Sequence, residues 1–282
     1  MRLVFGTLHL PDTAVAGRLL DRYVDAGGRA LDVANVYQAG EASRTVGRWL
    51  ANGAAERPVL YAKGCHPPRC RPDLVVAEID EARTLLGVDR IDVFILHRDD
   101  TAYPVAAWAD ALLAEVDAGR IGDFGVSNWT IERTRELRAH LDSIGADHLR
   151  AFSNHFSLAR MITPPWPGCL ALSTDELREL GELDVAVLAW SSLATGYFAG
   201  HDTPHWDNAE NRARRDRAAA LAEQRGTSAP VIALAYVLHQ PDHVLPVVGT
   251  RSEEHLDEAI GAAAIRLSAD ELAWLETGRN GA

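Results

Sequence analysis

The sequence predicts a single-domain α/β protein with the (β/α)8 TIM-barrel fold. Short apolar runs alternate with amphipathic stretches along the chain, which is typical of parallel strands joined by covering helices. We find eight such strand–helix units, and eight parallel strands can close into a barrel. No linker or low-complexity segment interrupts the pattern, so we expect residues 1–282 to form one domain.

Eight apolar runs are the expected strands. Each is short, as buried parallel strands are, and each is followed by a polar or glycine-containing turn. In chain order they span residues 2–6, 29–33, 58–62, 91–96, 121–126, 149–153, 185–189 and 243–248.

The expected helices lie between these runs. In residues 14–26, for example, apolar side chains recur at helical spacing. Leu19, Leu20 and Tyr23 there fall on one face, which predicts an amphipathic helix. The same periodicity predicts helices over residues 73–86, 105–118, 131–141 and 174–180.

An open, doubly wound sheet is the alternative fold. Dinucleotide-binding sheets of that kind carry a G-x-G-x-x-G loop after the first strand. Here the first run ends at Gly6 and Thr7 with no such loop, which favours the barrel.

Two connections, residues 154–173 and 191–211, are long for this fold. Both follow strands, so in a barrel they rise from the C-terminal face, where active sites are found. Aromatic residues in or near these loops either line a substrate pocket or anchor the loops to the surface. The expected pocket residues are Trp129, Trp166, Phe198 and Trp206.

The formal net charge of −12 argues against binding to nucleic acid or to an anionic membrane surface. No apolar run is long enough to span a membrane, and the N-terminus lacks the pattern of a signal peptide. Three cysteines are an odd number, which fits a reducing compartment. We therefore expect a cytoplasmic monomer or small homo-oligomer that acts on a small molecule.

Lys63 is the only lysine among the 28 basic residues of the chain. It ends the third apolar run, where an ammonium differs chemically from the arginine used everywhere else. Coding bias toward arginine would explain the composition without any function. The residues at the neighbouring strand ends favour a functional interpretation.

Four polar side chains follow successive strands. Asp32 lies at the end of the second run, Tyr37 in the loop after it, Lys63 at the end of the third and His97 after the fourth. In a barrel these ends are adjacent on one rim, so we expect the four side chains to converge. Individually, each residue also fits a cap, a packing contact or a structural hydrogen bond.

The chemistry of this quartet suits carbonyl reduction. A nearby ammonium lowers the pKa of a phenol, and an aspartate can hold that ammonium in place. A histidine can orient a carbonyl oxygen. The phenol could then protonate an oxygen that becomes anionic, while a cofactor supplies the hydride.

The segments around these residues resemble the aldo-keto reductase family. Residues 31–37 resemble its D-T-A-x-x-Y segment, residues 62–63 its strand-three lysine, residues 96–100 its L-H-x-x-D segment and residues 125–129 its G-x-S-N segment. The resemblance implies a barrel that binds NADP(H) without a Rossmann fold. It also implies Tyr37 as general acid, Lys63 and Asp32 as its tuning pair, and His97 as the residue that orients the carbonyl.

The resemblance extends to cofactor contacts, with substitutions. His155 stands where the family usually has glutamine, and Trp190 where it often has tyrosine. His255 stands where many members carry arginine or glutamine, which leaves the choice between NADPH and NADH open, with Arg251 as the candidate phosphate ligand. The implied cofactor residues are Gly6, Thr7, Ser127, Asn128, His155, Trp190, Ser191, Ser192, Leu193, Gly249, Thr250, Arg251 and His255.

Two departures from the family pattern stand out. Members commonly begin with a hairpin that plugs the barrel, and we expect that plug to be short or absent here. Cys65, His66 and Cys70 raise the question of zinc, but no second ligand cluster accompanies them, so we expect no metal site. Two alternative functions are a nicotinamide-binding sensor on the same barrel and a metal-dependent hydrolase.

Overall fold

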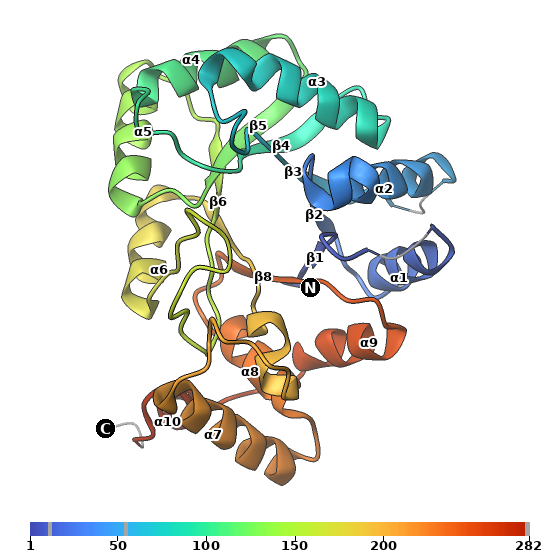
Figure 1. Cartoon of the computed structure of the whole chain (residues 1–282), viewed down its shortest axis with the longest axis vertical. Helices are drawn as coiled ribbons and strands as arrows, with labels where there is room; N and C mark the ends of the chain where they lie inside the picture. The colour runs from blue at the N-terminus through green and yellow to red at the C-terminus, as the bar shows by residue number, and fades with distance from the viewer. Residues whose placement is uncertain (11–12, 54–55, 280–282) are drawn as a thin grey trace.

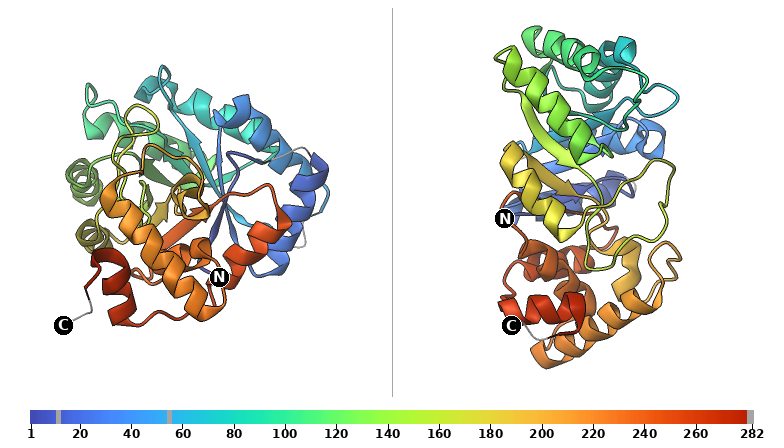
Figure 2. Two further views of the ribbon diagram at one scale, coloured as in Figure 1. Left: turned by 60° about the horizontal axis from the view of Figure 1, so that its bottom comes forward. Right: turned by 90° about the vertical axis from the view of Figure 1, so that its left-hand side faces the viewer.

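The computed structural model describes residues 1–10, 13–53 and 56–279. Eight parallel strands form a closed barrel in chain order, and the helices surround it (Figures 1 and 2). The predicted TIM barrel is therefore confirmed, and every predicted strand is found within two residues of its expected ends. The strands are β1 (Val4–Gly6), β2 (Ala30–Ala34), β3 (Val59–Gly64), β4 (Ile91–Leu96), β5 (Ile121–Ser127), β6 (Leu149–Ser153), β7 (Ala186–Ala189) and β8 (Val244–Val248).

The five predicted helices are also present within two residues of their expected ends. They are α1 (Thr13–Asp25), α3 (Val75–Leu86), α4 (Val105–Asp117), α5 (Ile131–Ser143) and α6 (Thr174–Leu180). The further helices are α2 (Glu41–Ala51), α7 (Ala209–Arg225), α8 (Ala229–Leu238), α9 (Glu253–Ala262) and α10 (Ala269–Thr277), with short 3-10 turns η1 (Tyr37–Gly40), η2 (Pro72–Leu74), η3 (Gly181–Leu183) and η4 (Ala194–Ala199).

Side-chain caps fix where several helices begin. Ser173 and Ser268 each form a capping box with a glutamate three residues later, at the starts of α6 and α10. Thr130 accepts a hydrogen bond from a backbone N–H at the start of α5, and Ser252 does the same for α9. The cap at Ser252, four residues after the end of β8, fixes the start of α9 at the C-terminal rim of the barrel.

The core has two parts. A large cluster fills the space between the strands and the helices, where α8 is buried over residues 231–238. A small cluster fills the barrel interior and includes Val93, Ile95, Leu188 and Val247. This packing closes the inside of the barrel and leaves the C-terminal strand ends free to carry polar side chains. Within the described residues, none of the helices is both long and apolar enough to cross a membrane.

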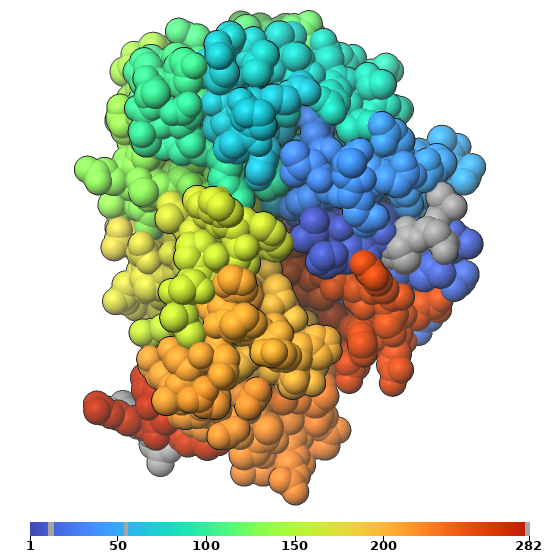
Figure 3. Space-filling view, viewed as in Figure 1, coloured from blue at the N-terminus to red at the C-terminus, as the bar shows by residue number. Residues whose placement is uncertain are grey.

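The long connection after β6 has no helix before α6, and the one after β7 contains η4. Both lie on the same face of the molecule, where Figure 3 shows the yellow-green atoms of the first beside the gold atoms of the second. The two predicted loops therefore border the C-terminal rim together.

Gly125 allows β5 and β6 to approach closely. The pairing register of these strands shifts between Phe124 and Gly125. A Cβ atom on Gly125 would lie 2.5 Å from the backbone oxygen of Ala151, which is closer than packed atoms tolerate. This contact sets the position of the two residues that end and follow β5, Ser127 and Asn128.

We predict that Gly125→Ala lowers the free energy of unfolding by about 1–3 kcal/mol, because the backbone of β6 must move. The matched control is Gly17→Ala in α1, where nothing lies within 4 Å of the added Cβ and a gain of up to about 1 kcal/mol is expected. Chemical denaturation of both variants measures the difference. If Gly125→Ala were as stable as Gly17→Ala, β5 and β6 would not be in tight contact at Gly125.

Candidate active site

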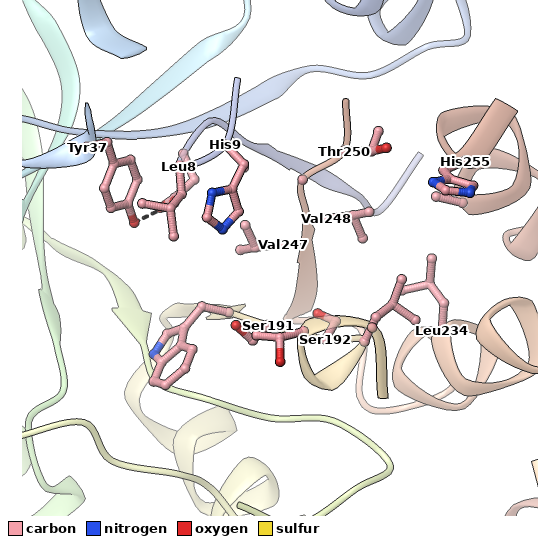
Figure 4. A pocket seen from close by; sticks show the side chains of 18 of the residues that line it. Leu8, His9, Tyr37, Ser191, Ser192, Leu234, Val247, Val248, Thr250 and His255 are labelled. Carbon is pink, nitrogen blue, oxygen red and sulfur yellow. Dashed lines mark hydrogen bonds between the residues drawn. The ribbon is translucent and has the colours of Figure 1, made fainter. Parts of the chain in front are cut away.

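A cavity of about 980 Å³ opens at the C-terminal rim of the barrel. It is elongated, with Tyr37 and Leu8 toward one end and Thr250 and His255 toward the other (Figure 4). Ser191 lies on the wall opposite His9. Its size and its mixture of apolar and polar walls suit a cofactor together with a small substrate.

Asp32, Lys63 and Tyr37 form a connected polar chain at the first of these ends. Lys63 Nζ lies 2.6 Å from Asp32 Oδ1, and it donates a hydrogen bond of 3.2 Å to Tyr37 Oη. Tyr37 Oη donates in turn to Asp32 Oδ2 at 3.2 Å. The side chains of Asp32 and Lys63 are only 3% and 2% exposed, so water screens this ion pair little.

The register of the barrel explains this convergence. Ala34 of β2 pairs with Lys63 of β3, and Asp32 precedes Ala34 by two residues. Residues two apart in a strand point to the same side of the sheet, so Asp32 and Lys63 both face inward. Tyr37 begins η1, whose next two residues, Gln38 and Ala39, have left-handed backbone angles (φ 49° and 53°) that fold the chain back over the rim.

Burial, not the lysine, dominates the electrostatics of the phenol. Burial and the neighbouring Asp32 carboxylate raise the pKa of Tyr37 to about 12, although Lys63 acts in the opposite direction. Lys63 does lower the pKa of the phenol, as expected from the sequence, but its effect is weaker than that of burial. Burial also opposes the charge of Lys63, but Asp32 and Tyr37 outweigh it and raise the lysine pKa. At neutral pH the phenol is protonated and the ammonium is charged.

His97 follows β4 and completes the quartet. Its ring lies edge-on to Tyr37, with 5.9 Å between ring centroids. Burial, Lys63 and Arg98 hold the pKa of His97 well below its usual value, so the imidazole is neutral. Its Nδ1 atom is buried without a hydrogen-bond partner among the described residues. His66, at 5.0 Å between centroids, contacts it from the loop after β3.

Ser127 and Asn128 line the cavity at the end of β5. Asn128 has a left-handed backbone (φ 58°), and its amide donates to Ser127 Oγ at 2.9 Å. Ser127 Oγ donates to the backbone oxygen of Ser153 at 2.7 Å. Asn128 Oδ1 accepts from the backbone N–H of Leu170, which ties the loop after β6 to the rim.

His155 supports Trp190 from behind. Trp190 lines the cavity, whereas His155 and Trp206 do not. Trp206 Nε1 donates to His155 Nε2 at 3.1 Å, so His155 Nδ1 carries the proton and donates to the backbone oxygen of Trp190 at 3.0 Å. These two residues therefore position Trp190 and do not face the cavity.

The far end of the cavity lies where β8 leads into α9. Thr250, Arg251 and His255 line it, and backbone N–H groups at the start of α9 make this end suited to an anion. Arg251 Nε donates to the backbone oxygen of His9 at 3.1 Å, which joins this segment to the loop after β1.

The other predicted site residues divide into two groups. Gly6, Ser192, Leu193 and Gly249 line the cavity, as do Trp166 and Phe198. Thr7 lies behind the wall and donates to the backbone oxygen of Asp32 at 2.9 Å. Trp129 also lies outside the cavity, packed against Trp108 and Arg133.

Sequence reasoning missed several lining residues that come from turns next to the predicted ones. Leu8, His9, His66 and Arg98 lie within three residues of a strand end, which is a signal that could have identified them. Cys169, Thr195, Gly196, Ala199, His201, Leu234, Val247 and Val248 line other parts of the wall.

The cysteines of the loop after β3 are buried. The Cys65 backbone N–H donates to Glu78 at 2.8 Å, and Cys70 Sγ donates to the backbone oxygen of Arg98 at 3.2 Å. Within the described ranges, no three His, Cys, Asp or Glu side chains are grouped so that they could share a metal ion.

A model of the Aldo/keto reductase family matches residues 2–277. The norsolorinic acid reductase of Aspergillus flavus is 25% identical over 287 residues, covering 93% of this chain and 70% of the relative. The 6-dehydroglucose reductase of Novosphingobium aromaticivorans is 29% identical over 280 residues, covering 93% and 84%. An aldo-keto reductase from Klebsiella pneumoniae, solved in complex with NADPH, shares the fold with a TM-score of 0.78 and 22% identity over 99% of this chain and 90% of that one.

Because Trp190 is held by a buried, neutral His155, we expect the stability of the folded protein to depend on pH. Burial lowers the pKa of His155 from 6.5 to about 4, so the unfolded chain binds a proton that the folded protein does not. Stability therefore falls as the pH falls from about 6.5 to about 4. A glutamine side chain can replace both hydrogen bonds of His155. We predict that His155→Gln loses about 3 kcal/mol less free energy of unfolding over this pH range than the wild type does.

Denaturation curves collected across this pH range measure the effect. The control is His255→Gln, the same exchange at an exposed position. If His155→Gln and the wild type lose stability in parallel, protonation of His155 is not the cause.

Proposed function

This chain belongs to the aldo/keto reductase family, and we propose that it reduces an aldehyde or ketone to an alcohol, or runs the reverse reaction, with NADP(H) as cofactor. The observation that carries the proposal is the chain Asp32–Lys63–Tyr37, in which a protonated phenol faces the cavity beside a neutral imidazole. A reductase needs such an acid next to the carbonyl oxygen. The reductase names of two relatives agree with it.

The lining of the cavity fits a nicotinamide dinucleotide. The indole of Trp190 offers an aromatic surface, and Ser127 and Asn128 offer groups that can bind an amide. At the other end, Thr250 and the start of α9 suit phosphate oxygens. When bound, the cofactor supplies the hydride. The complex of the Klebsiella pneumoniae neighbour with NADPH supports this assignment.

The position of Arg251 supports a preference for NADPH over NADH. Its guanidinium lies beside the phosphate-binding end and forms no ion pair within the described residues, which suits an additional phosphate. His255 lies on the same wall (Figure 4).

The residues of the quartet have separate roles in the proposed reaction. Tyr37 donates its proton to the carbonyl oxygen as negative charge develops there. Lys63 then stabilises the phenolate, and Asp32 keeps the ammonium charged and in place. His97, being neutral, can donate a hydrogen bond that orients the carbonyl oxygen.

A cofactor and carbonyl panel tests the proposal. Purified protein is mixed with NADPH or NADH and a range of aldehydes and ketones, and the absorbance of the reduced nicotinamide is followed. We expect oxidation of NADPH with at least one class of carbonyl. Binding of NADPH without oxidation across the panel would favour a sensor and contradict the proposed activity.

We predict that Tyr37→Phe lowers kcat at least about 100-fold, because it removes the proton donor while keeping the ring. The affinity for NADPH, measured by fluorescence titration, should change little. The control is Tyr103→Phe, which removes a phenol that does not line the cavity. Retention of most of kcat by Tyr37→Phe would exclude it as the acid.

We predict that Lys63→Arg also lowers kcat at least about 100-fold, although it keeps the positive charge. The planar guanidinium is larger than an ammonium and cannot occupy the buried space between Asp32 and Tyr37. The control is the opposite exchange at the surface, Arg57→Lys, in an exposed ion pair with Asp92. A near-normal rate for Lys63→Arg would show that charge alone suffices.

A further inference from the structure

Arg98 is a buried cation on the wall of the cavity. It is only 7% exposed, and it follows His97 in the sequence. In the part of the chain that the structure describes, no carboxylate forms an ion pair with it. A buried charge without a counter-charge is strongly unfavourable, so an unpaired guanidinium in a binding cavity points to an anionic ligand.

The hydrogen bonds of Arg98 do not neutralise it. One Nη1 N–H donates to the backbone oxygen of His97 at 2.8 Å, and one Nη2 N–H donates to Cys169 Sγ at 3.3 Å. A carbonyl carries no net charge, and a thiol sulfur is a weak acceptor. The guanidinium has five N–H donors, so its capacity is only partly used.

The acidic residues nearest to Arg98 in the sequence have other hydrogen-bond partners. Asp99 accepts a hydrogen bond of 3.1 Å from Arg133 Nε, and Asp100 accepts one of 3.0 Å from the backbone N–H of Ala102. Asp32 pairs with Lys63. The carboxylates around the reacting end of the cavity therefore leave the charge of Arg98 uncompensated.

The position of Arg98 places its charge next to the proposed chemistry. A hydrogen bond to the His97 backbone oxygen holds the guanidinium in place, and Cys169 and Trp166 line the cavity from the loop after β6. Burial lowers the pKa of His97 most, and the charges of Lys63 and Arg98 lower it further. A substrate whose carbonyl reaches Tyr37 and His97 would thus bring its other groups close to Arg98.

We propose that Arg98 binds a carboxylate group of the substrate, so that the preferred substrates are oxo acids, meaning aldehydes or ketones that also carry a carboxylate. The proposal rests on the proposed carbonyl reduction and narrows its substrate class. The planar fork of arginine matches the two oxygens of a carboxylate and can bind both. The net charge of −12 does not oppose this, because local charges decide binding in a cavity.

Matched pairs of substrates test the proposal. Succinic semialdehyde is compared with its methyl ester, and 4-carboxybenzaldehyde with methyl 4-formylbenzoate, all with NADPH. We expect kcat/KM of the wild type to favour the acids over the esters. In Arg98→Met this acid-to-ester ratio should fall about 10- to 100-fold, mainly through KM, because a charge-assisted pair is lost. Arg98→Lys should retain an intermediate ratio.

A binding measurement separates failure of this proposal from failure of the proposed function. Terephthalate is titrated into the NADP⁺-saturated protein while tryptophan fluorescence is recorded, with inorganic phosphate as a second ligand. Tight binding of terephthalate that Arg98→Met weakens supports the anion site even if no carbonyl is reduced. Tighter binding of phosphate would overturn the carboxylate assignment.

Three results, two kinetic and one from the titration, would also overturn it. In the first, the wild type reduces esters as well as acids. In the second, Arg98→Met impairs both members of each pair equally, which indicates a structural role in holding the loop after β6. In the third, terephthalate binds with the same affinity to the wild type and to Arg98→Met. Thermal denaturation of both variants establishes that they are folded.

Discussion

Lys63 lies between Asp32 and Tyr37 at the mouth of the barrel and is bonded to both. A buried ammonium is stable only with a counter-charge, and removal of one partner of a buried ion pair typically costs about 3–5 kcal/mol. The inward direction of Asp32 and Lys63 follows from the register of β2 and β3, so the ion pair depends on closure of the barrel. The protonated state of Tyr37 depends in turn on this pair and on burial.

The rest of the site is also held together by contacts between residues that follow different strands. Ser127 donates to the end of β6, Arg251 reaches back to the loop after β1, and the backbone of Trp190 is held by His155. Each wall of the cavity is thus fixed by a residue from a different strand–helix unit. Because loops on a barrel can vary in sequence while the strands stay the same, the substrate can be selected without disturbing the quartet.

The strands and the quartet could be predicted from the sequence because their signals are local. Buried parallel strands are short apolar runs, and polar residues at their ends must meet on one rim in a closed barrel. Helix α8 was not predicted because it is buried on nearly all sides and shows no amphipathic period. Helix α7 was missed for the opposite reason, since most of its residues are polar or charged.

The direction of individual side chains was less accessible to sequence reasoning. Trp129 and Trp206 follow the expected strands and loops, but both point into the protein, and no spacing rule distinguishes an aromatic that lines a cavity from one that supports it. Arg98 was not predicted as a ligand-binding residue, because only the coordinates show that no carboxylate among the described residues pairs with it. The pKa of Tyr37 likewise depends on burial, which outweighs the lysine next to it.

The single lysine has a practical consequence for chemical labelling. Lys63 is the only lysine of the chain, is 2% exposed and is engaged by two partners, so amine-reactive reagents should modify it slowly in the folded protein. Acylation of Lys63 would, for the same reason, report how often the mouth of the barrel opens to solvent.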